Sequence, residues 1–570
     1  MQLRTARRWL FGGVTTTLVV GVTITASTQI QPAAQRTAAG AAQRTTTDAA
    51  PQPAAAAAPT LPLGAADLRE TRTSRQIAPG VTHIAVERGQ VSSDEFWTLT
   101  VGLATSEAEA DALSDRVRAA GYEPRLDPTA GPDPRGPQDR PLGWAVRVGR
   151  YPDEAAADRA RTAVAARGLS AAVQHTGADG HATDGPWSLD VLVLDPARFR
   201  GSLRSELASG VVPGRETTSA TARRTHALAA VNGGYFVIGG SHTTPGNWVA
   251  GTDGDPAGIS VVGGALLSES VGARPALVIP GDSVRGTSVR RLRTGSTVAV
   301  AGGATRKVTG LNRQPGLIAN CGGVGTITPF SHPAHDYTCG NVNELVALTA
   351  KFGSTAPQGP GYQVTLDATG RVTAVRGSRG GAVPARGTLL QGTGTEAQWL
   401  RTHARTGARL TVRSTVTDAD TGAAVPLAAR TSVVNGGPLL LRDGAIALDP
   451  VRDGWSPEDI KGADRAAVYN NWYLRRNPRT AAGVTADGRV VLLTVDGRRP
   501  DRSAGLSITE TAEVLRSLGA VDALNLDGGG STTMVVRGAL QGRPSDAAGE
   551  RPVGDALVVV PKPAPVRPSP

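Results

Sequence analysis

Residues 523–536 read ALNLDGGGSTTMVV, and this stretch decides how the rest of the chain is interpreted. Two apolar runs flank an Asn, an Asp, three glycines and three hydroxyl residues. Consecutive glycines give up side-chain packing and cost backbone entropy, so the chain either turns there or lets another group approach its backbone closely. The pattern predicts a strand, a loop opened by Asp527 and a second strand. The backbone N–H groups of such a loop are able to face an anion.

The segments just upstream predict a helix and a hairpin. SITETAEVLRSLGA (507–520) has apolar residues at helical spacing, with Ser507 or Thr509 as its N-cap and Gly519 at its end. RTAAGVTADGRVVLLTVDGRR (479–499) is typical of a hairpin that turns at Asp-Gly. Together with many further short apolar runs, these elements favour a strand-rich α+β domain with mixed sheets over residues 178–560.

Two Asn-Gly-Gly turns follow apolar strands further upstream. ALAAVNGGYFVIGG (227–240) contains Asn232, and TSVVNGGPLLLRDG (431–444) contains Asn435. Each motif alone is more often a plain turn than a binding site, because Asn and Gly both favour turns. The repetition nevertheless marks both asparagines as candidates for contacting a ligand or orienting a neighbouring group.

An internal repeat occupies residues 92–177. FWTLTVGLATSEAEADALSDRVRAAGYEPRL (96–126) and GWAVRVGRYPDEAAADRARTAVAARGLSAAV (143–173) each predict a strand, a helix and a strand. Ser106 and Asp153 are expected to cap the two helices. The copies predict a small ferredoxin-like βαββαβ module, inserted into the main domain or placed N-terminal to it.

The segment RQIAPGVTHIAVERG (75–89) precedes the repeat and predicts one strand, placed within residues 75–91. A lone strand needs a partner, and the strand that begins at Trp187 is the most economical choice. We therefore expect the module to be inserted between two neighbouring strands of the main domain, since insertions are tolerated where chain ends lie close together.

The first residues predict export. Arg4, Arg7 and Arg8 precede a mildly apolar stretch, which indicates an export signal over residues 1–30, with a retained membrane anchor as the alternative. Residues 31–74 are rich in Ala, Thr, Gln and Pro and predict a disordered tether, and residues 561–570 predict a Pro-rich tail. The expected location is secreted or cell-wall associated, or membrane-anchored if the signal is not cleaved.

Charge and cysteine content narrow the function further. The formal net charge is +11, but the arginines are scattered without a dense basic tract, so no nucleic-acid partner is expected. The two cysteines, Cys321 and Cys339, predict a disulfide in an exported chain. A metal site that also uses the intervening His332 and His335 is the less favoured alternative, and neither a metal nor another cofactor is expected.

Two resemblances to known families follow from these motifs. VNGGYF, NGGPLL, NPRTAAG, VDGRR, GLSITETAEVLRSLGAVDALNLDGGGSTTM and RPSD occur in this order, and the region resembles the phosphodiester glycosidase family, which includes the lysosomal uncovering enzyme. Residues 92–177, with VGRYPDEAAADRA and strands that begin at Trp97 and Trp144, resemble the SPOR domain, a bacterial module that binds peptidoglycan. The stretch of about 200 residues between the two Asn-Gly-Gly motifs has no counterpart that can be aligned with the first family.

The resemblance implies a substrate in which the anomeric carbon of a sugar is bonded to a phosphodiester. The candidate catalytic carboxylates are Glu510, Asp527 and Asp496. The candidate substrate-binding residues are Arg479, Asn232, Asn435, Asn525, Gly528, Gly529, Gly530, Ser531 and Thr532. Asp546 of RPSD and Arg551 are expected to close the site from the other side, with a surface loop as the alternative.

Each carboxylate also has a structural interpretation. Glu510 fits a capping box, Asp496 an Asp-Gly turn, and Asp527 a loop hydrogen bond. Phosphate is a stable leaving group and gains little from protonation. For catalysis we therefore expect a carboxylate that activates water or acts as the nucleophile, together with phosphate-binding groups, to matter more than a general acid. The sequence thus predicts an exported hydrolase of a sugar-1-phosphodiester, such as one carrying N-acetylglucosamine, in cell-envelope glycans, targeted by peptidoglycan binding. A non-catalytic protein that binds the cell wall or an exopolysaccharide is the alternative.

Overall fold

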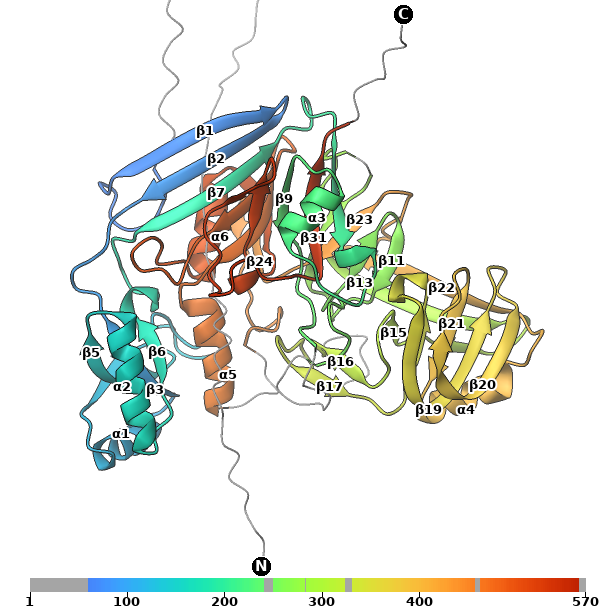
Figure 1. The fold of residues 1–570 in the computed structure, drawn as a ribbon, viewed down its shortest axis with the longest axis horizontal. Coiled ribbons are helices and arrows are strands. Elements are labelled where there is room, and N and C mark those ends of the chain that lie inside the picture. Colours follow the sequence, from blue (N-terminus) through green and yellow to red (C-terminus); the bar gives the residue numbers. More distant parts are fainter. Residues whose placement is uncertain (1–59, 240–249, 282, 323–330, 457–461, 563–570) are drawn as a thin grey trace, which may run out of the picture.

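The computed structural model describes residues 60–239, 250–281, 283–322, 331–456 and 462–562, so the predicted export signal and most of the C-terminal tail lie outside the described residues. The described chain is α+β, with strands predominating (Figure 1). Within it, no helix is both long and apolar enough to cross a membrane.

The largest sheet has eight strands in the order β1-β2-β7-β27-β26-β28-β24-β25, and all neighbours run antiparallel. Its strands are β1 (Glu70–Ala78), β2 (Val81–Arg88), β7 (Trp187–Leu194), β24 (Leu439–Arg442), β25 (Ala445–Ile446), β26 (Arg479–Thr485), β27 (Val490–Val495) and β28 (Ala520–Asn525). Helix α6 (Ile508–Ser517) covers one face, where its Val514 and Leu515 join the buried cluster formed with Val491 and Leu493.

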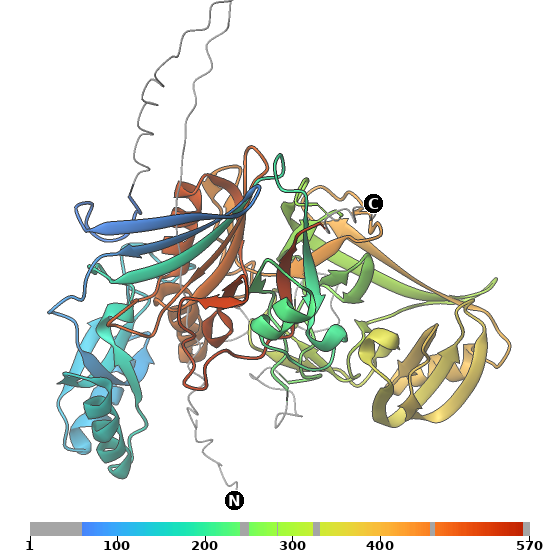
Figure 2. The same ribbon diagram turned by 45° about the horizontal axis from the view of Figure 1, so that its top comes forward.

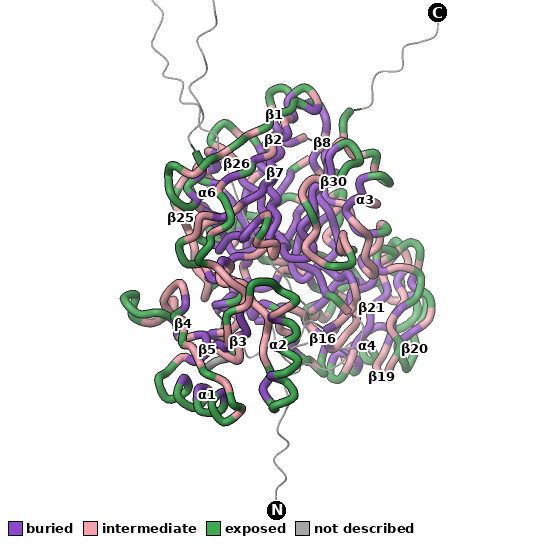
Figure 3. Tube along the Cα trace, turned by 60° about the vertical axis from the view of Figure 1, so that its left-hand side comes forward, coloured by how far each residue is buried: buried purple, intermediate pink, exposed green. Residues whose placement is uncertain are grey.

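A five-stranded sheet in the order β30-β29-β9-β31-β8 packs against the other face. Its strands are β8 (Ser202–Leu207), β9 (Ala229–Asn232), β29 (Met534–Val536), β30 (Ala539–Gln541) and β31 (Asp555–Val560), and α3 (Thr218–Arg224) lies outside it. The glycine loop therefore connects β28 of one sheet to β29 of the other. Figure 3 shows buried residues concentrated in this part of the molecule, whereas the small helices α1 and α2 are mostly exposed.

The stretch between the two Asn-Gly-Gly motifs folds into further sheets. One contains β10 (Ser260–Val262), β11 (Ala265–Ser268), β12 (Pro275–Ile279), β13 (Ser288–Val300), β14 (Thr305–Lys307), β22 (Leu410–Asp418) and β23 (Ser432–Asn435). The other forms an outer lobe from β15 (Gly310–Leu311), β18 (Leu345–Leu348), β19 (Thr355–Leu366), β20 (Val372–Ala382) and β21 (Thr388–Gly392), covered by α4 (Gly394–His403) (Figure 2). The parallel pairing of β15 with β18 makes this lobe a mixed sheet.

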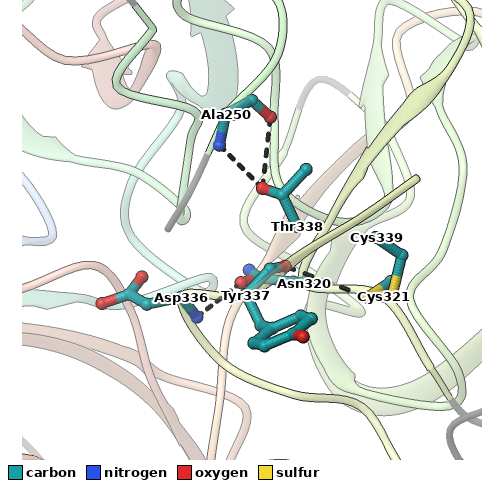
Figure 4. The surroundings of a disulfide bond; sticks show 7 residues. All are labelled: Ala250, Asn320, Cys321, Asp336, Tyr337, Thr338 and Cys339. Atoms are coloured by element: carbon teal, nitrogen blue, oxygen red, sulfur yellow. Dashed lines mark hydrogen bonds between the residues drawn. A yellow bond between two sulfur atoms is a disulfide. The ribbon is translucent and has the colours of Figure 1, made fainter. Parts of the chain in front are cut away.

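The predicted disulfide is present. Cys321 and Cys339 are bonded, with their Cα atoms 5.9 Å apart, next to the small ladder of β16 (Leu317–Ala319) and β17 (Thr338–Gly340) (Figure 4). The interpretation of these cysteines as metal ligands is therefore not supported. Across the described residues, no group of three or more His, Cys, Asp and Glu side chains is arranged to hold a metal ion.

The module folds as β3 (Trp97–Ala104), α1 (Glu107–Ala119), β4 (Pro124–Pro128), β5 (Trp144–Tyr151), α2 (Glu154–Ala166) and β6 (Ala172–His175), with the sheet order β4-β5-β3-β6. Ser106 and Asp153 cap its helices, as predicted. β2 pairs with β7 from Val81 opposite Leu194 to Arg88 opposite Trp187, so the module lies between two neighbouring strands of the large sheet.

Two expectations for the segment before the module are wrong. Residues 75–89 do not form one strand, because the chain turns after Ala78 and makes the hairpin β1–β2. The end of the predicted tether, residues 60–74, is ordered, because Leu61 and Leu63 are buried in the main core. The buried Arg88 fixes this segment by donating hydrogen bonds to the carbonyl oxygens of Leu63 (2.8 Å) and Ala65 (2.6 Å). The prediction of disorder rested on the Ala-rich composition of the whole segment, in which these two leucines carried little weight.

The module is held against the main domain by helix α5 (Gly462–Tyr469) and the π-helical turn η4 (Asn470–Leu474) that continues it. Arg475 donates hydrogen bonds to Asp179 and Gln174, and Arg465 forms an ion pair with Asp133. The same turn carries Trp472 to the opposite side, where it lies beside Arg479. One element thus links the module to the centre of the main domain.

Candidate functional site

The glycine loop lies between Arg479 on one side and the Asp546–Arg551 pair on the other. The backbone of Gly528 faces Pro478 and Arg479 at the start of β26, and Gly530 faces the side chains of Asp546 and Arg551. A Cβ atom at Gly530 would collide with these two side chains, so the close approach requires glycine. Arg551 donates two hydrogen bonds to Asp546, at 2.8 and 3.1 Å. The chain after β29 therefore returns to the loop, as the resemblance implied.

Arg479 points an unused guanidinium edge into this region. The side chain is fully buried, and its Nη2 donates to the carbonyl oxygen of Trp472 at 2.8 Å. Its Nε and Nη1 have no hydrogen-bond partner among the described residues. Burial lowers the pKa of Arg479, while the nearby Asp527 and Tyr235 oppose that shift. Buried donors without partners are costly, so they indicate a place where an acceptor is meant to bind.

Arg498 of the VDGRR motif provides a second guanidinium with unused donors. Its Nη1 lies 3.7 Å from Asp546, and neither terminal nitrogen makes a hydrogen bond within the described part of the chain. The buried hydroxyls of Thr532 and Thr533 likewise have no partner there, whereas the Ser531 hydroxyl interacts with the Asp527 carboxyl group. Arginine forks, hydroxyls and glycine N–H groups are the donors that phosphate oxygens accept, so this arrangement suits an anionic ligand.

Asp527 contributes a carboxyl group next to these hydrogen-bond donors. It is 8% exposed, and its Oδ1 accepts a hydrogen bond from the N–H of Gly528 at 2.8 Å. Burial, together with a second carboxyl group, Asp336, raises the pKa of Asp527 to about 7, while Ser531 and Arg551 oppose the shift. An acid whose pKa lies near neutrality is able to hold or release a proton under working conditions.

The three candidate asparagines mainly orient other groups. Asn232 donates to the carbonyl oxygen of Asp527 (2.7 Å) and accepts from Thr480 (2.5 Å). Asn435 makes two hydrogen bonds with the backbone of Tyr235. Asn525 donates to the Tyr235 hydroxyl (2.6 Å), and only its Oδ1 has no partner among the described residues. Among the three, only Asn525 retains a side-chain polar atom without a partner in the described residues.

Glu510 and Asp496 are held in other arrangements. Glu510 completes a capping box with Ser507, and its carboxylate also accepts hydrogen bonds from Arg476 at 2.7 to 3.2 Å. Asp496 accepts from Arg502 (2.5 Å) and from the N–H of Arg543 (2.7 Å). The carboxylates of Glu510 and Asp496 are thus each held by an arginine and a backbone N–H group. The geometry thus brings Arg479 and Asp527 together and favours the structural interpretation of Glu510 and Asp496.

Sequence reasoning missed the residues that enclose the other side of the site. The Tyr235 hydroxyl donates to the carbonyl oxygen of Gly437 at 2.8 Å, and its ring packs edge-on against His335 with centroids 4.8 Å apart. His335 stacks on Trp455 and meets Trp472 edge-on. Asp336 follows His335 directly. Tyr235 was visible in the VNGGYF motif, but the residues around Asp336 lie in the stretch that cannot be aligned and carry no local signal.

Comparison with known proteins agrees with this geometry. Residues 361–560 match the family model described as phosphodiester glycosidase, and residues 93–174 match the SPOR domain. The chain is 36% identical over 107 residues to N-acetylglucosamine-1-phosphodiester alpha-N-acetylglucosaminidase from Bos taurus, which covers 19% of each chain. It is 47% identical over 68 residues to the Mus musculus enzyme of the same name, which covers 12% of this chain and 13% of that one. The chain thus spans less than a fifth of the length of these curated relatives.

The chain therefore carries a domain of the phosphodiester glycosidase family together with a SPOR domain. Its similarity to one solved structure extends much further. A presumed exported protein from Burkholderia pseudomallei K96243 is 37% identical, with a TM-score of 0.80, over 88% of this chain and 98% of that protein. The arrangement of the two domains within one chain is thus shared with a bacterial relative.

Proposed function

We propose that this protein is an exported glycosidase that hydrolyses a sugar-1-phosphodiester bond, such as that of N-acetylglucosamine-1-phosphodiester, in glycans of the cell envelope. The observation that carries the proposal is the set of buried donors without partners on Arg479, Arg498 and Thr532 around the carboxyl group of Asp527. These donors would hold the phosphodiester, and Asp527 would lie at the anomeric carbon. The names of the curated relatives support this substrate class.

The chemistry follows from the leaving group. Cleavage of the bond between the anomeric carbon and oxygen releases a phosphomonoester, whose negative charge grows as the bond breaks. Arg479 and Arg498 stabilise that charge through planar forks that match phosphate oxygens. Preorganised hydrogen-bond donors in a site with little water stabilise developing charge strongly. The phosphate contacts of the two arginines therefore supply much of the rate enhancement. Asp527, when ionised, stabilises the positive charge that develops on the sugar ring.

The SPOR domain adds peptidoglycan as a proposed partner. The domain would keep the enzyme at the cell wall after export, and the relative from Burkholderia supports an extracytoplasmic location. Co-sedimentation of the full-length protein with purified sacculi, with cellulose as the control polymer, tests the partner. N-terminal sequencing of the protein released by the native host tests the export signal, and a start near residue 30 is expected.

Turnover of a chromogenic N-acetylglucosamine-1-phosphodiester by the purified protein tests the activity. We expect hydrolysis by the wild-type protein and a loss of at least about 100-fold in kcat for Asp527→Asn, as is typical for a group that acts directly on the reacting atoms. Binding of the substrate without any turnover, unchanged in Asp527→Asn, would instead favour the non-catalytic wall-binding protein.

A further inference from the structure

Asp336 is held in a conformation that ordinary loop residues avoid. It lies outside the segment that matches the glycosidase family model, within the loop closed by the Cys321–Cys339 disulfide. Its φ angle is +54°, in the left-handed region, which is unfavourable for a residue with a Cβ atom. Asp tolerates this conformation better than most residues, and the surrounding contacts select it here.

A buried asparagine enforces this conformation. The N–H of Asp336 donates to Oδ1 of Asn320 at 2.9 Å, and Nδ2 of Asn320 donates to the carbonyl oxygen of Ala257 at 3.2 Å. Figure 4 shows the main chain of Asp336 bonded to Asn320, with its carboxyl group directed away from the disulfide. The disulfide and Asn320 therefore fix the backbone and leave the carboxyl group available.

That carboxyl group faces the site. It accepts a hydrogen bond from the side chain of Trp472, whose carbonyl oxygen holds Arg479, and it lies within electrostatic range of Arg274 and Asp527. Half of its side chain remains exposed (52%), in contrast to 8% of the residue Asp527. Solvent thus reaches Asp336, whereas Asp527 is enclosed beside the phosphate-binding donors.

We propose that Asp336 is the base that activates water in this site, a role that rests on the proposed glycosidase function. The oxygen of a water molecule attacks the anomeric carbon while one of its protons passes to the Asp336 carboxylate. The bond between the anomeric carbon and the phosphate oxygen breaks, and its electron pair leaves with the phosphomonoester. The products are the free sugar and the phosphomonoester, and Asp336 returns its proton to solvent through its exposed edge.

The electrostatic surroundings fit this role. Although half of its side chain is exposed, desolvation by the surrounding protein raises the pKa of Asp336 to about 6, and Arg274 and the hydrogen bond from Trp472 oppose the shift. The other charged or titratable groups that face it are Asp527, Tyr235 and His335, and the pKa of His335 is lowered by burial, which keeps that imidazole neutral. A carboxylate with a pKa of about 6 is ionised at neutral pH and is a stronger base than an ordinary aspartate. Turnover should therefore fall as the pH drops through about 6.

The test compares full-length wild type with Asp336→Asn and Asp336→Gly on the chromogenic phosphodiester. Asn and Gly both tolerate a positive φ, so both variants are expected to fold, which thermal unfolding checks. Asp443→Asn is the matched control, because Asp443 is exposed and has a φ of +50°. We expect kcat to fall by about 10²- to 10⁴-fold in both Asp336 variants, the range for loss of a general base. The control should retain wild-type kcat.

Two further readouts separate a catalytic base from a structural residue. The acidic limb of the pH profile near pH 6 should disappear in Asp336→Asn. Sodium azide, which needs no base, should restore turnover in Asp336→Gly and yield a glycosyl azide. If the wild type is active and Asp336→Asn retains its kcat and its acidic limb, the inference is overturned while the proposed function stands. If the wild-type protein shows no turnover, both the proposed function and this inference are contradicted.

Discussion

Arg498 has a largely buried guanidinium whose terminal nitrogens make no hydrogen bond within the described part of the chain. Its φ angle of +57° also lies in the left-handed region, as does that of Asp336. Two strained residues from distant parts of the chain therefore contribute to one site. Strain and unpaired buried donors both lower stability, and proteins retain such features chiefly where function depends on them.

This argument gives a prediction in which activity and stability move separately. Arg498→Gln should lower kcat/KM by about 10²-fold, because a charged contact to the phosphate is lost. The free energy of unfolding should stay the same or rise slightly, because the terminal nitrogens of this largely buried arginine make no hydrogen bond and their ion pair with Asp546 is long, at 3.7 Å. Steady-state kinetics and thermal unfolding of the same preparation measure both. A large drop in stability would show that Arg498 supports the fold instead.

Glu510 leads to the opposite expectation. Its carboxylate caps α6 and pairs with the buried Arg476, so Glu510→Gln should cost about 1–3 kcal/mol of stability while kcat changes less than threefold. Urea unfolding and turnover assays test this. A loss of 100-fold or more in kcat without a change in stability would show that Glu510 is catalytic after all.

At the scale of elements, the module and the large sheet are joined by a simple connection. β2 and β7 are neighbouring antiparallel strands, and Arg88 and Trp187 are paired at the end where the module enters and leaves. A short linker is therefore able to replace the module without moving either strand. The ion pairs of Arg475 and Arg465 would be lost, but both arginines belong to α5 or the segment after it, outside the core of the two sheets.

Deletion of residues 92–177, with a short Gly/Ser linker in their place, should leave a folded domain that unfolds cooperatively at a lower temperature. It should retain turnover of the small phosphodiester and lose co-sedimentation with sacculi. Circular dichroism, thermal unfolding and the two functional assays check these outcomes. A collapsed protein that binds hydrophobic dyes would show that the module is required for the main fold.

At the scale of the whole molecule, buried carboxyl groups make stability depend on pH. Burial raises the pKa of Asp527 and of Asp555 to about 7, and Asp555 is buried where it accepts a hydrogen bond from the N–H of Gly234 at 2.9 Å. Between the ordinary pKa of about 4 and a pKa of about 7, the folded state binds more protons than the unfolded state. Stability should therefore decrease as the pH rises through this window and level off above it.

We expect a higher melting temperature at pH 5 than at pH 8. One group shifted by about three units contributes on the order of 4 kcal/mol, although neighbouring acids are coupled and do not add fully. Asp555→Asn should flatten the dependence, because an amide mimics the protonated acid and does not ionise. Calorimetry at several pH values tests this, with Asp443→Asn as the exposed control. A variant with an unchanged slope would show that Asp555 does not contribute.

The sequence by itself determined the local elements: the capped helices of the repeat, the Asp-Gly hairpin, the strand–loop–strand around Asp527 and the disulfide. Each is specified by residues close together in the chain, through capping, turn preference, alternation or the pairing of the two available cysteines. Leu61 and Leu63 were an exception, because two leucines in an Ala-rich stretch are significant only once a core exists to bury them.

Only the tertiary structure decided which polar residues meet. It placed Asp336 from the disulfide loop near Asp527, brought Arg479 beside the glycine loop and Arg498 beside Asp546, and paired Glu510 with Arg476. Burial and electrostatic interaction depend on distance in space, and these partners are mostly far apart in sequence. Residue type and spacing therefore identified the loop that forms the site, while the packing of the sheets and the inserted stretch selected the groups that surround it.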